Sequence, residues 1–169
     1  DPYGQQRTPL HRDQPQRWAE PGPGGAAGGA ATATSHSAKE VQIRRRISEA
    51  LNRDDHAAAA GEYLQLIQFV DDAVLTATQQ LSIANHLMDA EQHAAAADAY
   101  ERFLRRYGQQ YEHIGDIRLM LGLIYGRYLM ENEKAESNLS KATEELLDPD
   151  KVELARRELQ TVRKRLGRA

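Results

Sequence analysis

Cysteine is absent from this 169-residue chain, which excludes disulfides, thiolate zinc sites and cysteine nucleophiles and leaves the redox compartment open. No sign of charge dominates, because 22 Lys and Arg stand against 25 Asp and Glu. Long apolar runs are also missing. The most apolar stretch, 117–130, contains Arg118 and Arg127 and is shorter than the roughly 20 residues of a membrane span. We therefore expect no nucleic-acid partner and no direct membrane insertion.

Proline and glycine are distributed unevenly. Residues 1–38 hold five of the six prolines and half of the 12 glycines, with few large apolar side chains besides Trp18. Such a composition cannot bury enough surface to offset its ordering entropy, so we expect a flexible linker over 1–38 and a folded domain over 39–169. Trp18 is either a lone aromatic residue or a short docking motif. The chain starts at Asp1 without methionine, which suggests a processed form or a piece of a longer protein.

From Lys39 onward, helix-forming residues dominate and apolar residues recur at helical spacing. Clusters of Asp, Asn and Glu interrupt the pattern where helices are expected to end and the next ones to be capped. No stretch shows the alternation of a strand. The sequence predicts an all-α fold with helices over 39–53, 55–69, 72–89, 92–107, 112–130, 134–147 and 150–166.

The segment His-Ala-Ala-Ala-Ala occurs twice, with His56 and His93 spaced by 37 residues. Each copy is expected to open the second helix of an antiparallel pair, where alanines allow close approach and a following tyrosine fills the space beside them. A third unit has the same small and large residues at the same spacing. A period of this length made of two helices is typical of an α-solenoid, in which neighbouring pairs share a core. The matching triplets are Ala59, Tyr63 and Leu66; Ala96, Tyr100 and Phe103; and Ala135, Leu139 and Ala142.

The repeated pattern resembles the tetratricopeptide repeat family, most clearly in LGLIY at 121–125 and AESNLSKA at 135–142. The resemblance covers about 39–147, which implies three helix pairs. The last helix, whose apolar residues from Val152 to Leu166 form one stripe, is expected to cap them. The chain departs from the family's pattern early in the first helices, where Gln80 and Arg118 replace an aromatic residue. We therefore expect a divergent member.

No constellation of catalytic residues is evident. The histidines lack an HExxH pattern, and His56 and His93 occupy equivalent repeat positions, which are about 10 Å apart in stacked helices and too far to share a metal ion. Neighbouring acidic pairs such as Asp71 and Asp72 suit helix ends. Phosphate-binding loops and serine nucleophile motifs are missing. We expect no enzymatic activity, no cofactor and no metal.

The resemblance implies that the first helices of the pairs line a concave groove that binds a peptide or helix of another protein. Asn85 stands where the family often places an asparagine that bonds the ligand backbone. Leu81 and Leu119 replace the lysines that hold a C-terminal carboxylate in some members, so the ligand is expected to be apolar. The expected groove residues are Thr78, Leu81, Ser82, Asn85, Met88, Asp116, Leu119, Leu123 and Arg127, although stacking contacts are the better interpretation for Leu119 and Leu123.

Three functions remain open at this point. The first is a protein-binding scaffold or adaptor tethered by the linker, with a cytoplasmic location. The second is a structural element that self-associates, through the apolar helix at 117–130 or an uncapped end. The third is the soluble tail of a membrane protein, since some bacterial rhomboid-like proteases look similar in carrying helical-repeat tails after a proline-rich linker.

Overall fold

The computed structural model describes residues 27–168, and their side chains from His36 onward. Residues 1–26 of the expected linker, with Trp18, lie outside the described residues. The rest of the expected linker differs from the prediction, because the first helix begins at Ala27 and residues 27–38 are helical.

Within residues 27–168 all regular secondary structure is helical, which confirms the all-α prediction. Seven α-helices and one π-helical segment follow one another along the chain, and no helix in this part of the chain is both long enough and apolar enough to cross a membrane. The elements are α1 (Ala27–Leu51), α2 (His56–Leu66), α3 (Ala77–Asp89), α4 (His93–Tyr107), α5 (Ile114–Leu123), η1 (Ile124–Leu129), α6 (Asn132–Glu145) and α7 (Pro149–Arg165).

Two of the expected helices differ in their bounds. The helix expected from residue 72 begins only at Ala77. Ala73 and Leu75 lie in an irregular loop before it, and their side chains are buried from there. The helix expected over 112–130 is split: its last part, η1, has the wider π-helical turn and ends at Leu129, just before Met130, whose φ is 56°. Apolar spacing alone does not distinguish these arrangements from continuous helices.

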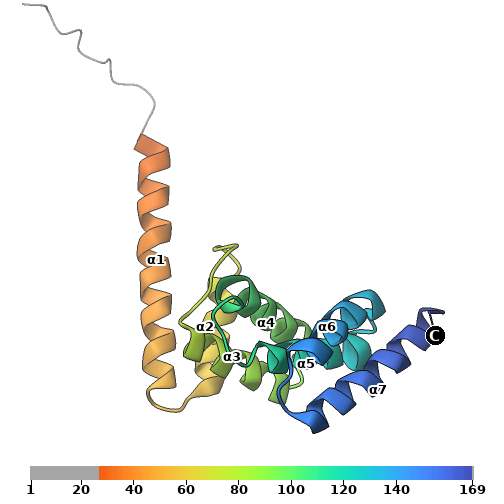
Figure 1. The fold of residues 1–169 in the computed structure, drawn as a ribbon. Coiled ribbons are helices and arrows are strands. Elements are labelled where there is room, and N and C mark those ends of the chain that lie inside the picture. Colours follow the sequence, from red (N-terminus) through yellow and green to blue (C-terminus); the bar gives the residue numbers. More distant parts are fainter. Residues whose placement is uncertain (1–26, 169) are drawn as a thin grey trace, which may run out of the picture.

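The helices pack mainly against their neighbours in sequence. The closest pairs are α1 with α2, α3 with α4, and α5 with α6, while α7 packs on α6. Figure 1 shows this order from α1 at one end to α7 at the other, with the N-terminal part of α1 extending beyond the other helices. The alanines and the larger residues of the repeated triplets are all buried, so they form the contacts within and between pairs.

The three connections within pairs share one backbone conformation. Asp54, Glu91 and Met130 each adopt a left-handed conformation, with φ of 56°, 59° and 56°, two residues before the second helix of the pair begins. In the first two turns the next residue's N–H bonds back to a carbonyl of the preceding helix, from Asp55 to Ala50 and from Gln92 to Leu87. This is the Schellman arrangement that ends many helices. The third turn closes with a wider bond, from the N–H of Glu131 to the carbonyl of Tyr125 in η1, so the three units share the left-handed residue and the first two share the whole turn.

Helices α5 and α6 approach closely at two glycines. A Cβ atom on Gly115 would lie 2.7 Å from the backbone of Glu145 and Leu146, and one on Gly122 would lie 2.5 Å from the side chain of Leu139. Such distances are far below van der Waals contact. The absence of a side chain at Gly115 and Gly122 thus sets the distance between the two helices.

Helix α7 covers the end of the last pair. Its N-cap Asp148 accepts a hydrogen bond from the N–H of Asp150, with Pro149 in the first turn, where proline needs no hydrogen-bond partner. Three residues of its predicted apolar stripe, Ala155, Leu159 and Val162, are buried. The helix therefore removes apolar surface of α6 and η1 from solvent.

Candidate functional site

The expected groove residues on α3 form a partly open strip. Thr78 and Asn85 are exposed, whereas Leu81, Ser82 and Met88 are half-buried. Leu81 and Met88 also pack against the core. A ligand on this strip would contact polar atoms and the outer parts of two apolar side chains.

Two polar residues of the α3 strip already bond to neighbouring helices. Asn85 Oδ1 accepts a hydrogen bond from the hydroxyl of Tyr100 on α4 at 2.5 Å. Ser82 Oγ lies 3.1 Å from Nδ1 of His56 on α2. These bonds fix the two side chains, and they leave Thr78 as the residue of the strip that is most open to a ligand.

The expected groove residues on α5 and η1 lie against α7 or inside the core. Lys151 donates to Asp116 at 2.7 Å, and Arg127 donates to Glu158 at 3.2 Å and through a second, shorter bond. Leu119 is buried and Leu123 is half-buried. Sequence reasoning did not anticipate that α7 would supply partners for both charged residues. A ligand would have to compete with α7 for Asp116 and Arg127.

The histidines of the repeated segment each stack on another ring. The rings of His56 and His86 are 6.1 Å apart, and those of His93 and Tyr128 are 3.9 Å apart. Within the described part of the chain no three metal-ligating side chains come together. His56 and His93 each start a second helix, as the sequence predicted, and face the first helix of the following pair.

Buried tyrosine hydroxyls connect helices, Tyr100 within the pair α3–α4 and Tyr125 between α4 and η1. Burial, with a smaller contribution from the charge of Asp89, raises the pKa of Tyr100 from its ordinary value of 10 to about 12. Burial and the nearby Glu101 carboxylate, which accepts a bond from Tyr125 at 2.6 Å, raise the pKa of Tyr125 further. Both hydroxyls therefore stay protonated at neutral pH and act as hydrogen-bond donors that hold helices together.

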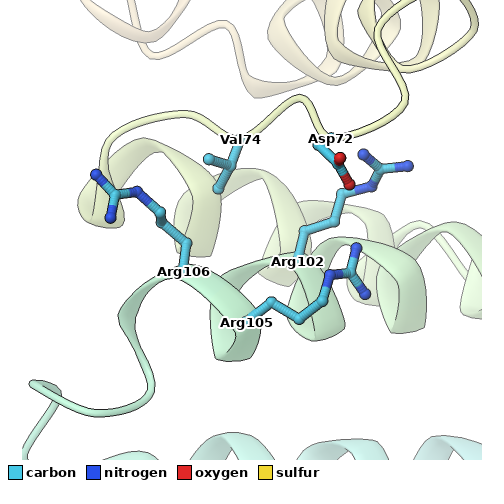
Figure 2. Close-up of a pocket in the computed structure, with 5 residues that line it drawn as sticks. All are labelled: Asp72, Val74, Arg102, Arg105 and Arg106. Carbon is cyan, nitrogen blue, oxygen red and sulfur yellow. The ribbon is translucent and has the colours of Figure 1, made fainter.

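Sequence reasoning missed a pocket that arginines line. It has a volume of about 230 Å³ between the loop 67–76 and the C-terminal part of α4 (Figure 2). Figure 2 shows Val74 between Arg106 on one side and Arg102 with Asp72 on the other, with Arg105 below them. A second pocket of about 380 Å³ shares Val74 and Arg106 and is lined by Arg44 as well. We call Val74 and these four arginines the arginine surface.

Two arginines of this surface hold the loop in place. Arg102 donates to the backbone oxygens of Asp71 and Ala73, the latter at 3.2 Å. Arg44 donates to the backbone oxygen of Val74 at 2.9 Å. These partners are about 30 positions away in sequence. The only local signal is the adjacent pair Arg105–Arg106, whose contact with the loop no sequence period predicts.

No protein-family model matches the chain, and no curated protein is significantly similar to it.

Proposed function

We propose that this chain is a tetratricopeptide-like helical-repeat scaffold that binds another protein through the strip on α3 and has no catalytic role. The observation that supports the proposal best is the recurrence of a left-handed residue, Asp54, Glu91 or Met130, in each connection between two helices that pack on one another. Pairs repeated in this way stack into a solenoid whose first helices share one face. The exposed side chains on α3, Thr78 and Asn85, would then lie on that face.

The partner proposed for this strip is an extended or helical segment with apolar side chains. Leu81 and Met88 offer half-buried apolar surface, and Asn85 has amide hydrogens besides the oxygen that Tyr100 occupies. A buried apolar anchor surrounded by a few polar contacts is the usual composition of such an interface.

The test is a comparison of two threonine variants of the full chain. Thr78→Arg places a long charged side chain on the strip, while Thr161→Arg makes the same change on the exposed side of α7. These sites are preferable to Asn85 and Arg127, whose bonds to Tyr100 and Glu158 also support the fold. We expect immobilised parent chain and Thr161→Arg to retain the same partner from cell lysate, and Thr78→Arg to lose it. Equal retention on all three columns would reject the strip as the binding site.

Self-association is the second candidate, and the exposed side chains of Tyr128 and Met130, 49% and 58% accessible, favour it. Most other apolar residues of 117–130, including Ile117, Leu121 and Ile124, are buried within the chain, which leaves little else of that helix for pairing. Sedimentation equilibrium over a hundredfold range of concentration separates the two candidates. A rising mass that Met130→Ser abolishes would favour self-association.

A further inference from the structure

We propose that the arginine surface binds an acidic segment of another protein. This binding site is separate from the α3 strip and does not depend on the function proposed for that strip. The two pockets of the surface adjoin at Val74 and Arg106, so an extended segment could occupy both.

The charges that line the two pockets are mostly positive. Arg44, Arg102, Arg105 and Arg106 line the two pockets together with one carboxylate, that of Asp72. Arg44 and Arg102 are already paired with Glu40 and Asp98, at 2.8 and 2.6 Å, so the free positive charge comes from Arg105 and Arg106. Arg105 and Arg106 are exposed and form no ion pair with any residue of the described chain. Two unpaired guanidiniums beside an apolar side chain are available for a ligand, and their planar donors match the two oxygens of a carboxylate.

The backbone around the pockets is held before any ligand arrives. Besides the bonds from Arg44 and Arg102, the hydroxyl of Tyr107 donates to the backbone oxygen of Leu75 at 2.6 Å. The N–H of Leu75 donates to Oε1 of the fully buried Gln80 at 3.0 Å. A loop fixed from several helices loses little entropy on binding, which favours affinity.

The N-terminus of α3 adds positive potential to the second pocket, which Thr76 and Gln79 help to line. The side chain of Thr76, the N-cap residue of this helix, makes no capping hydrogen bond, so it does not neutralise the first N–H groups of the helix. The helix dipole therefore has the same sign as the arginines.

The surroundings favour a short protein segment over a nucleic acid. The chain has a net charge of −3, and Asp71 and Asp72 lie in the same loop as Val74. A long phosphate backbone would meet these carboxylates and gain little from counterion release. An acidic peptide places separate carboxylates against Arg105 and Arg106 and an apolar side chain against Val74.

The probe is a short fluorescein-labelled peptide that alternates Glu with Gly around one central Leu, and its control has Gln in place of each Glu. Binding to the full chain is followed by fluorescence anisotropy. The test variant is Arg105→Glu with Arg106→Glu. The matched control is Arg156→Glu with Arg157→Glu, which changes an adjacent exposed pair on α7 by the same charge. Circular dichroism verifies that both variants keep the helical content of the parent.

We expect the Glu peptide to bind the parent and the α7 control with similar affinity, and to bind the test variant at least about tenfold more weakly. The Gln peptide should bind no variant measurably. Arg105→Lys with Arg106→Lys keeps the charge but removes the planar donors, and a several-fold loss is expected. Equal weakening in both Glu variants, tighter binding of an oligothymidine than of the peptide, or no binding of the Glu peptide would each overturn the proposal.

Discussion

Gln80 is the buried polar side chain on which the loop, α2 and α4 converge. It is fully buried, its Oε1 accepts from the N–H of Leu75, and its Nε2 donates to Tyr63 Oη at 2.9 Å and to the backbone oxygen of Ala99 at 3.0 Å. The resemblance expected an aromatic side chain here. The amide replaces aromatic packing with hydrogen bonds that also fix the loop before α3.

Gln80→Leu should lower the free energy of unfolding by about 3 kcal/mol, because it leaves the Leu75 N–H and the Tyr63 hydroxyl buried without partners. Urea denaturation followed by circular dichroism measures the change. Gln79→Leu is the control: Gln79 is half-buried and donates to Ser48 at 3.0 Å, so its loss should cost less than about 1 kcal/mol. Equal effects of the two substitutions would contradict the role assigned to Gln80.

Tyr100 should make stability fall at alkaline pH. The folded chain binds the Tyr100 proton more tightly than the unfolded chain, since the pKa rises from 10 to about 12 on folding. The stabilisation that this proton provides is complete below pH 10 and is lost as pH rises towards about 12. Urea denaturation at several pH values should show a steep decline for the parent and a shallower one for Tyr100→Phe. In Tyr100→Phe, the free energy of unfolding should still fall with pH to some extent, because the pKa values of Tyr63 and Tyr125 are also raised.

At the scale of elements, two helical glycines should respond oppositely to alanine. Gly61 on α2 is exposed and has nothing within 4 Å of an added Cβ, so Gly61→Ala should stabilise the chain by about 0.5–1 kcal/mol through helix propensity. Gly115→Ala would bring its Cβ to 2.7 Å from the backbone of α6 and its C-terminus, and should destabilise by about 2 kcal/mol or more. Thermal unfolding of both variants measures the difference. A gain in stability at Gly115 would show that α5 and α6 separate at little cost.

The left-handed turn at Glu91 offers a stabilising substitution. A residue with a Cβ atom pays roughly 1 kcal/mol for this conformation, which glycine adopts freely. Glu91→Gly should therefore raise the free energy of unfolding by up to about 1 kcal/mol. Gln92→Gly is the matched control, because Gln92 has φ of −84° and glycine there relieves no left-handed strain. Equal effects at the two positions would argue against strain at Glu91.

Helix number and order were predictable from sequence because apolar spacing is a local signal. The start of α3 was not, since the buried loop residues Ala73 and Leu75 fit a helical spacing as well as α3 itself does. What keeps them out of the helix is a set of distant partners, among them Arg102 and Tyr107 on α4. The ion pairs of the expected site residues Asp116 and Arg127 could not be predicted for the same reason, because their partners are distant in sequence, on α7.

At the scale of the whole molecule, α7 should be required for stability. Ending the chain after Asp148 removes the buried side chains of Ala155, Leu159 and Val162. Their burial corresponds to about 4–6 kcal/mol, comparable to the total stability of a small domain. We expect the truncated chain to unfold at a much lower temperature or to aggregate. Arg156→Ser with Lys164→Ser alters only the exposed side of α7 and should change stability by less than about 1 kcal/mol. A truncated chain as stable as the parent would contradict this role.

The neighbour-to-neighbour packing of the helices also has a kinetic consequence. Because contacts join helices that are adjacent in sequence, folding closes only short stretches of chain, and a low contact order favours folding in the microsecond to millisecond range. The same arrangement gives the molecule no single central element that all others need. When the chain is stretched from its two ends, we expect it to unfold one helix pair at a time, so that its length increases in steps.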